Sequence, residues 1–390
     1  MIERKLLRRL LESLSYFPIV GLIGARQVGK TTLAKALGAY LPKPVLYLDL
    51  ENFADAAKLA DAQGYLSQHF DKCVILDEVQ QRPDLFALLR SLCDQKREPA
   101  RYILLGSASP YLIRDLTETL AGRIAYHELT PFSLTEIQHL YPMREHWFRG
   151  GFPGALLAPT SSLSRKWLLD FVETFVTRDV KRLSGAVPET KIHNLIRMVA
   201  HLHGSLLNMS QLSNSLDISQ PTVGRYLDLL EGSFLVRRLP PFFENTGKRL
   251  VKSPKIYLRD TGLLHRLIGV ADAEALAGHP QLGASWEGYV IEQIIREADE
   301  GGQFYFYRTS HGAEADLVWI TDHNKRICIE IKYSVAPSIS RGFQESARDL
   351  RPDFRYVIIP EGESYSRSDG IRVCSLPDFL KVEMPVLQSR

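Results

Sequence analysis

The sequence predicts an α/β protein that starts with a doubly wound parallel sheet, continues into a mostly helical region and ends in a second mixed α/β region. Three observations lead to this prediction. Short apolar runs alternate with helical patterns between Ile19 and Leu105, as parallel strands do when helices cover both faces of their sheet. A glycine-rich loop joins the first apolar run to the first helical pattern. The alternation ends at Arg149–Gly154, and the stretch from about Ser164 to Glu231 has mostly helical periodicity.

The elements of the first region follow from the length of each apolar run. Runs of the length expected for buried strands are Ile19–Ile23, Val45–Leu48, Val74–Leu76 and Tyr102–Leu105. Helical patterns lie between them, notably at Thr31–Leu41 and Asp84–Lys96. Strands and helices that alternate in this order form a doubly wound parallel sheet.

The bulk composition excludes several classes of protein. No apolar run approaches the ~20 residues that a membrane-spanning helix needs, so we expect no membrane partner. Residues Met1–Lys5 are followed by no signal-peptide core. The cysteines are scattered and form no CxxC pair, which predicts reduced thiols in a cytoplasmic protein and argues against a zinc site. The net charge is only +3, so any surface that binds nucleic acid has to be local.

The loop after the first strand has the complete G-x4-G-K-T pattern, from Gly24 to Thr31. It follows a strand and opens a helix, which is the context that this motif requires. Backbone N–H groups and the helix N-terminus should hold the phosphates of ATP. Lys30 should reach the β and γ phosphates, and the Thr31 hydroxyl should hold Mg²⁺. The expected nucleotide contacts are Gly24, Gln27, Val28, Gly29, Lys30, Thr31 and Thr32.

The strand Val74–Leu76 leads directly into two carboxylates, Asp77 and Glu78. Asp77 is expected to bind Mg²⁺ through water, and Glu78 to orient and deprotonate the attacking water. The strand Tyr102–Leu105 ends in Gly106 and Ser107, and Ser107 is the candidate sensor of the γ-phosphate. A capped turn is the alternative reading of Ser107.

Together these motifs resemble the AAA-type ATPases of prokaryotes, with support from Leu120–Arg123 and Leu129–Phe132. More narrowly, they resemble the widespread family in which such an ATPase is fused to an uncharacterised C-terminal domain. Three further segments fit that family: Gly150–Pro153, Arg178–Val180 and Asp260–Leu263. The resemblance implies a homo-oligomeric ring in which an arginine of one subunit completes its neighbour's site. Arg123 is the candidate for this role, Arg114 and Arg178 are its rivals, and a plain surface arginine is the alternative.

Two short helices joined by a turn are predicted at Met209–Leu216 and Pro221–Glu231, and a strand should follow from Phe234. This arrangement resembles a winged helix-turn-helix, whose second helix enters a DNA major groove. The candidate DNA-contacting residues are Gln220, Thr222, Arg225, Arg237 and Arg238. The basic stretch that follows comprises Lys248, Arg249, Lys252 and Lys255. The alternative is a structural module that packs against the ATPase.

Near the C-terminus, Asp316 is followed by a hairpin and then by Glu330-Ile331-Lys332. This order resembles the core signature of the restriction-endonuclease-like nuclease fold. Strand alternation places Glu330 and Lys332 on the same face. The resemblance implies a second divalent metal shared by Asp316 and Glu330, with Lys332 polarising the phosphate or activating water. Glu287, on the preceding helix, matches a further acid of nucleases that cut branched DNA. The alternative is a fold that has kept its shell and lost cutting.

We therefore expect three domains: an AAA-type ATPase domain over residues 1–145, a helical and winged-helix domain over 146–250, and a nuclease-like domain over 251–390. The predicted function is an ATP-driven motor or remodeller that acts on branched DNA such as a Holliday junction. The alternative is an ATP-switched protein that binds a protein partner and turns over slowly.

Overall fold

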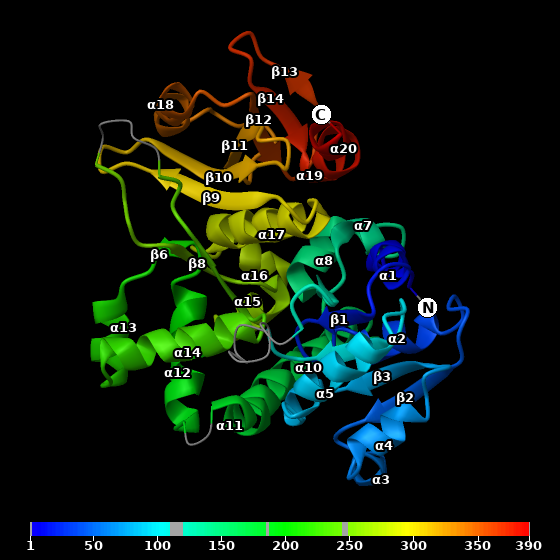
Figure 1. The fold of residues 1–390 in the computed structure, drawn as a ribbon. Coiled ribbons are helices and arrows are strands. Elements are labelled where there is room, and N and C mark those ends of the chain that lie inside the picture. Colours follow the sequence, from blue (N-terminus) through cyan, green and yellow to red (C-terminus); the bar gives the residue numbers. More distant parts are fainter. Residues whose placement is uncertain (1, 110–119, 185–186, 244–248, 390) are drawn as a thin grey trace. The chain divides into compact units, whose positions relative to one another are not determined.

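The computed structural model describes residues 2–109, 120–184, 187–243 and 249–389 (Figure 1). The chain divides into two compact units. Unit 1 comprises Met1–Phe132, Phe152–Gly154 and Asp228–Leu235, and unit 2 comprises Ser133–Gly151, Ala155–Leu227 and Val236–Arg390. The two predicted boundaries between the three domains are not tested by this division and stay predictions.

Over its described residues, unit 1 is built on a five-stranded sheet with the order β2-β3-β4-β1-β5. The strands are β1 (Ile19–Ile23), β2 (Val45–Asp49), β3 (Cys73–Asp77), β4 (Tyr102–Gly106) and β5 (Ile124–Glu128). Every pairing between them is parallel. The parallel α/β fold predicted for this region is confirmed, and the carboxyl ends of the strands therefore meet at one edge of the sheet.

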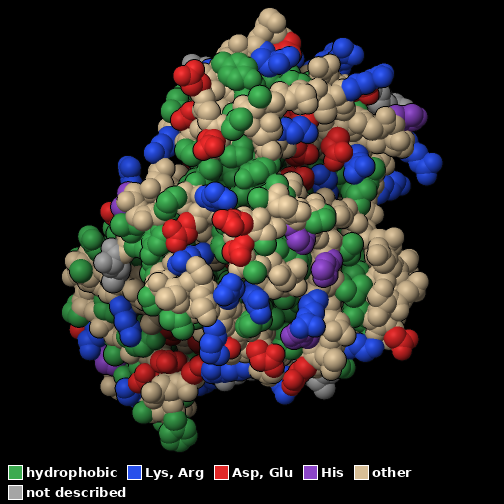
Figure 2. All heavy atoms as spheres, turned by 180° about the vertical axis from the view of Figure 1, so that it is seen from behind, with side chains coloured by type: hydrophobic (Ala, Val, Ile, Leu, Met, Phe, Trp, Pro, Cys, Tyr) green, Lys and Arg blue, Asp and Glu red, His purple; other side chains and the backbone are tan. Residues whose placement is uncertain are grey.

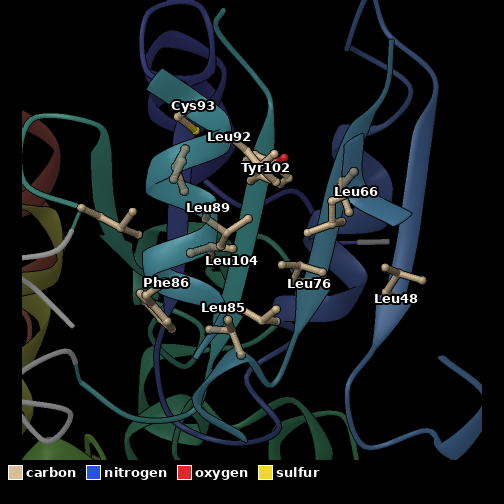
Figure 3. Packing of buried hydrophobic residues seen from close by; sticks show 14 of the residues in the cluster. Leu48, Leu66, Leu76, Leu85, Phe86, Leu89, Leu92, Cys93, Tyr102 and Leu104 are labelled. Carbon is tan, nitrogen blue, oxygen red and sulfur yellow. The ribbon is translucent and has the colours of Figure 1, made fainter. Parts of the chain in front are cut away.

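Helices connect and cover these strands. They are α1 (Leu6–Leu14), α2 (Lys30–Leu37), α3 (Phe53–Lys58), α4 (Ala62–Ser67) and α5 (Leu85–Gln95), with a 3-10 turn at Val79–Gln81. Figure 3 shows how α5 packs on the sheet: Leu85, Leu89 and Leu92, which recur at helical spacing, meet Leu76 and Leu104 of the strands. All five side chains are buried. Burying each of them stabilises the unit by about 1.5–3 kcal/mol, so this face of the sheet is held by apolar packing.

The first helices of unit 2 lie between Leu134 and Gly232 in the sequence. They are α7 (Leu134–Ile137), α8 (Met143–Arg149), α10 (Ser161–Thr174), a π-helical turn (Phe175–Asp179), α11 (Val180–Ser184), α12 (Glu189–His201), α13 (Met209–Leu216) and α14 (Gln220–Gly232). The short α9 (Pro153–Leu156) and α14 are each divided between the units: the start of α9 and the end of α14 belong to unit 1. The two helices predicted on either side of Asp217 are confirmed as α13 and α14, and Asp217 ends α13 with a φ of 50°.

Over its described residues, unit 2 contains two sheets. The smaller sheet has the order β6-β8-β7, with β6 (Ser205–Leu206), β7 (Val236–Leu239) and β8 (Lys255–Leu258) paired antiparallel. The larger has the order β13-β14-β12-β11-β10-β9. Its strands are β9 (Gln303–Arg308), β10 (Glu314–Ile320), β11 (Arg326–Ile331), β12 (Phe354–Ile359), β13 (Tyr365–Ser366) and β14 (Arg372–Ser375). The predicted hairpin after Asp316 is confirmed as the antiparallel pair β10–β11.

The remaining helices of unit 2 are α15 (Thr261–Leu267), α16 (Ala273–Ala277), α17 (Leu282–Glu297), α18 (Arg341–Leu350), α19 (Leu376–Asp378) and α20 (Met384–Gln388). No helix in the described ranges is both long and apolar enough to cross a membrane. The four cysteines, Cys73, Cys93, Cys328 and Cys374, are all buried, and none of them forms a disulfide. Burial raises the pKa of the Cys93 thiol to about 11 and that of the Cys73 thiol to about 12, so these thiols stay protonated at neutral pH.

Candidate functional site

The loop between β1 and α2 requires glycine at its first position. Gly24 has a φ of 146°, and a Cβ built on it would lie 2.2 Å from the carbonyl oxygen of Leu129. Gly29 has a φ of 100°, but no atom lies within 4 Å of the place where its Cβ would be. Packing therefore excludes a side chain at Gly24, whereas at Gly29 the backbone is left open to an approaching ligand.

The ammonium of Lys30 lies against this loop. Its Nζ donates to the carbonyl oxygens of Gly24 and Ala25, both at 2.9 Å. The side chain is buried, with only 6% exposed. A cation held by loop carbonyls is poised to exchange them for phosphate oxygens, because a phosphate carries the full negative charge that a carbonyl lacks.

Arg4, which sequence reasoning missed, supports the loop from outside. Its Nη1 donates to the carbonyl of Val28 at 3.0 Å, its Nη2 donates to the carbonyl of Thr130 at 2.6 Å, and its guanidinium lies 4.7 Å from the centre of the Phe132 ring. One arginine thus joins the loop to the Leu129–Phe132 motif. An arginine just before a helix gives no local signal of such a role.

The predicted magnesium-binding pair is assembled where β3 meets α2. The Thr31 hydroxyl donates to Asp77 Oδ2 at 2.7 Å, and the backbone N–H of Glu78 donates to Asp77 Oδ1 at 2.9 Å. The Tyr47 hydroxyl, from β2, also donates to Asp77 Oδ2 at 2.7 Å. A hydroxyl beside a buried carboxylate supplies the hard oxygen ligands that Mg²⁺ prefers, so these residues fit the ion.

Tyr47 is a second residue that sequence reasoning missed. Burial and the neighbouring Asp77 raise the pKa of its phenol above its usual range. The phenol therefore stays protonated and remains a donor to the Asp77 carboxylate. Its signal in the sequence is positional only: it stands two residues before the end of a strand that pairs with β3.

Glu78 has a separate set of partners. Its backbone is left-handed, with a φ of 55°. Ser107 Oγ donates to Glu78 Oε2 at 3.1 Å, Gln80 Nε2 donates to Ser107 Oγ at 3.1 Å, and Gln80 Nε2 also donates to Glu78 Oε2. The structure thus brings Ser107 to Glu78, as expected for two residues at adjacent strand ends. Gln80 was not predicted, and the role of Ser107 as a γ-phosphate sensor stays a prediction.

The candidate arginine Arg123 lies just before β5. Its Nε and Nη2 donate to the two carboxylate oxygens of Asp94, at 2.7 and 2.9 Å, and 29% of its side chain is exposed. Its rival Arg178 lies in the π-helical turn of unit 2, and Arg114 lies outside the described residues. The predicted action of an arginine across a subunit interface remains untested.

Known proteins resemble this chain over most of its length. The "Uncharacterized protein Rv2008c" of Mycobacterium tuberculosis is 40% identical over 372 residues, which are 95% of the chain and 83% of the relative. The chain belongs to the family of this protein. The "Uncharacterized protein Mb2031c" of Mycobacterium bovis matches with the same identity and coverage. An uncharacterized Haemophilus influenzae protein is 26% identical over 359 residues, 80% of the chain and 88% of the relative.

Three domain families match successive parts of the chain. Residues 16–138 match an AAA domain, residues 141–274 match the domain of unknown function DUF8612, and residues 282–379 match the domain of unknown function DUF4143. The AAA match contains the glycine-rich loop, Asp77, Glu78 and Ser107, and it confirms the predicted N-terminal ATPase domain. A solved structure, "The walker-type atpase paby2304 of pyrococcus abyssi", is 17% identical with a TM-score of 0.46, over 69% of the chain and 96% of that structure.

In the DUF4143 region, the acids predicted to bind a second metal have internal partners. The Lys255 ammonium lies 3.0 Å from Glu287 Oε1, 3.1 Å from Glu314 Oε1 and 3.9 Å from Asp316 Oδ1. Burial and the Glu287 charge raise the pKa of Asp316 to about 7. Across the described ranges, no group of three or more His, Cys, Asp or Glu side chains is arranged to hold a metal ion. The residues as found do not fit the predicted divalent cation.

Glu330 and Lys332 lie on one face, as predicted, but they pair with each other. Lys332 Nζ lies 2.9 Å from Glu330 Oε1, and the backbone N–H of Ser340 donates to Glu330 Oε2 at 3.4 Å. The side chain of Glu330 is only 4% exposed. The Glu330 charge is thus balanced within the protein.

The predicted DNA-contacting residues fall into two groups. Gln220, Thr222 and Arg225 lie together at the start of α14, where Gln220 and Arg225 are exposed and Arg225 Nη2 donates to Thr222 Oγ1 at 3.2 Å. Arg237 and Arg238 lie in β7 and are half-buried. The structure therefore does not gather all five into one surface.

Arg237 has an internal partner, the buried Glu292 of α17, with which it forms an ion pair. Arg259 and Arg296 lie 3.3 and 3.8 Å from the same carboxylate. Burial alone would raise the pKa of Glu292, but the three arginines outweigh it and lower the pKa to about 2. Arg237 thus serves the interior of unit 2, which its position in a basic stretch did not indicate.

Proposed function

We propose that the chain hydrolyses ATP in the presence of Mg²⁺ at the loop between β1 and α2, with Glu78 as the general base. The observation that carries this proposal is the separation of two carboxylates at the end of β3. Asp77 is bonded to the Thr31 hydroxyl at 2.7 Å, whereas Glu78 is bonded to Ser107 at 3.1 Å. Asp77 is therefore suited to bind magnesium together with Thr31, and Glu78 is left to act as the base.

Each residue then has one chemical role. Lys30 exchanges the loop carbonyls for phosphate oxygens and stabilises the charge that develops on them. Thr31 and Asp77 would hold the magnesium ion, which would neutralise phosphate charge. Glu78 accepts a proton from the attacking water, and Ser107 with Gln80 holds the carboxylate in position until water and phosphate arrive.

Phosphate release from ATP tests this proposal. The full chain should turn over ATP with Mg²⁺ and stop when a chelator removes the metal. Lys30→Ala should lose ATP binding, and Lys58→Ala, which removes an exposed lysine paired with Asp55 on α3, should match the wild type. A chain that binds no ATP, or a Lys30→Ala variant that turns over normally, would contradict the proposal.

We further propose that unit 2 couples this ATPase to DNA, with branched DNA such as a Holliday junction as substrate. On the face shown in Figure 2, lysine and arginine side chains lie among acidic ones and form no single basic patch. The observation that supports DNA binding is therefore a smaller group of residues. At the start of α14, Arg225 is exposed and contacts Thr222, and no acidic partner is found for it in the described part of the chain. A cation of this kind beside Gln220 and Thr222 suits a phosphate backbone.

ATPase rates with single-stranded, duplex and four-way DNA test the coupling. Stimulation should be greatest with four-way DNA, and Arg225→Ala should weaken DNA binding and reduce the salt slope by about one counterion. Arg341→Ala is the matched control, because Arg341 is 92% exposed and paired with Glu345. An ATPase rate that no DNA changes would instead favour an ATP-switched protein that binds a protein partner. The internal pairing of Arg237 with Glu292 already removes one candidate DNA contact.

A further inference from the structure

We propose that the Lys255 ammonium permanently occupies the place where a nuclease-like site would hold its divalent cation. The C-terminal region is then a metal-free module that does not cut DNA. This inference is independent of the ATPase, since all the residues involved lie in unit 2. It rests on the disagreement between the predicted metal site and the side chains found there.

Lys255 has the surroundings of a bound cation. It lies in β8, and only 4% of its side chain is exposed. Its Nζ lies 3.0 Å from a carboxylate oxygen of Glu287 and 3.1 Å from one of Glu314, with Asp316 at 3.9 Å. Carboxylates from α17 and β10 thus converge on one positive charge. Carboxylate oxygens are the ligands that a hard cation prefers, and here the ammonium supplies the positive charge that they surround.

The other oxygens of the cluster are also engaged. Asp316 Oδ2 accepts the backbone N–H of Ile331 at 2.8 Å, and Glu287 Oε1 accepts the Tyr257 hydroxyl at 2.5 Å. Arg308 lies 3.7 Å from Glu314 Oε2. These donors hold the carboxylates in their present orientation, which is arranged around the ammonium and not around an open metal position.

Displacing the ammonium would be unfavourable. A metal ion at this place would leave the Lys255 charge almost fully buried, near the Phe306 ring at 5.6 Å and without its carboxylate partners. An unpaired buried charge is strongly destabilising. Metal binding at this place is therefore expected to be weak.

Lys255 also joins two parts of the chain that match different families. It lies within residues 141–274, which match DUF8612, whereas Glu287, Glu314 and Asp316 lie within residues 282–379, which match DUF4143. A metal would bind the acids alone, but the lysine ties them to β8. With Lys255 in the place of a metal, the acidic cluster has a structural role: its ion pairs connect β8 of the small sheet to α17 and β10.

Mn²⁺ binding by the full chain, measured without nucleotide by electron paramagnetic resonance of the free ion, tests the proposal. The wild type should show no Mn²⁺ site in unit 2 tighter than about 1 mM. Lys255→Met removes the competing ammonium and should create one site at least about tenfold tighter. Adding Asp316→Asn to that variant should abolish the new site. Lys252→Met is the matched control, because Lys252 is exposed on the same segment, and it should bind as the wild type does.

Two results would overturn the proposal. The first is a tight Mn²⁺ site, or Mn²⁺-dependent nicking of four-way DNA, in the wild type that Asp316→Asn abolishes. The second is a folded Lys255→Met variant that binds no more Mn²⁺ than the wild type. If Lys255→Met does not fold, the wild-type measurements still decide. Neither readout depends on ATP turnover, so failure of the proposed ATPase would be seen separately.

Discussion

At the scale of single residues, two neighbouring carboxylates in β3 and just after it differ in what surrounds them. Asp77 accepts hydrogen bonds from the hydroxyls of Thr31 and Tyr47, both at 2.7 Å. Glu78 turns into the left-handed region, and its carboxylate meets Ser107 and Gln80 instead. Two acids of equal charge can therefore carry two tasks, since the geometry of their partners differs.

Glu78→Gln should bind ATP normally but hydrolyse it at least about 100-fold more slowly, because the amide keeps the shape and loses the basic oxygen. Fluorescent-nucleotide titration and phosphate release measure the two effects separately. Asp84→Asn is the control, because Asp84 is exposed and pairs with Arg82. Normal turnover by Glu78→Gln would show that another group is the base.

Glu292 makes stability depend on pH. The pKa of Glu292 is lowered from 4.5 to about 2 in the folded state. Its ionised carboxylate therefore contributes fully to the free energy of unfolding above pH 4.5, and this contribution is lost as the pH falls towards 2. The contribution at neutral pH is roughly 3 kcal/mol. Glu292→Gln should therefore lower the free energy of unfolding by about that amount at pH 7, and by progressively less below pH 4.5. Urea unfolding at several pH values measures the difference, and a difference that did not change with pH would refute the ionic account.

At the scale of secondary structure elements, local patterns predicted the first sheet well. The apolar runs Val45–Leu48 and Tyr102–Leu105 became β2 and β4 with one more residue at the carboxyl end of each. The helix predicted to end at Leu41 ends at Leu37, next to Gly38. The strand β5 was missed because its apolar run, Ile124–Tyr126, is short and is followed directly by His127 and Glu128.

The partners of the basic residues could not be predicted in this way. Lys255 and Arg237 stand in a basic stretch that suggests a solvated surface, yet Lys255 pairs with an acid 32 positions further on and Arg237 with one 55 positions further on. Periodicity reports which face of an element is apolar, but it carries no information on which distant charge meets a buried cation. The residues of the ATP site could be predicted to lie together, because they stand at the ends of strands whose parallel pairing brings those ends to one edge of the sheet.

The turn between β1 and α2 supplies a prediction about backbone conformation. Gly24→Ala would place a Cβ 2.2 Å from the Leu129 carbonyl oxygen, so the loop must shift. We expect ATP binding at least about tenfold weaker and a loss of roughly 1–3 kcal/mol in stability. ATP titration and urea unfolding measure these effects. Gly283→Ala, where no atom lies within 4 Å of the new Cβ, should change neither, and a Gly24→Ala variant as active as this control would refute the packing argument.

At the scale of the whole molecule, the open question is whether chains share their ATP sites. Within one chain Arg123 is bound by both carboxylate oxygens of Asp94. An arginine that acts on a neighbour has to leave this partner, and the exposed position of the pair makes that exchange inexpensive in free energy. Assembly in a ring would therefore be accompanied by release of Asp94.

Mixing two inactive variants tests this sharing. Arg123→Ala chains keep an intact loop, and Lys30→Ala chains keep the arginine, so a mixed oligomer contains some complete sites. Activity should reappear on mixing, because an arginine supplied by a neighbour is worth on the order of 10³ in rate. Phosphate release before and after exchange of subunits is the measurement. Arg82→Ala, which removes an arginine paired with Asp84, serves as the control.

A mixture that stays inactive under conditions where subunits exchange would argue that no site is shared. Full activity of Arg123→Ala alone would remove Arg123 from consideration and leave Arg178 as the described candidate. Either outcome leaves the assignment of Lys30 and Glu78 intact.

The burial of all four cysteines has a practical consequence for spectroscopy. A maleimide dye reacts with accessible thiolates, and these four thiols are buried. Burial also raises the pKa of the Cys73, Cys93 and Cys374 thiols. A cysteine introduced on the exposed Lys58 and another on the exposed Arg341 would then be the reactive positions of the native fold, without removal of any natural thiol. Energy transfer between dyes at such positions, one in each unit, would report directly whether ATP changes the distance between them.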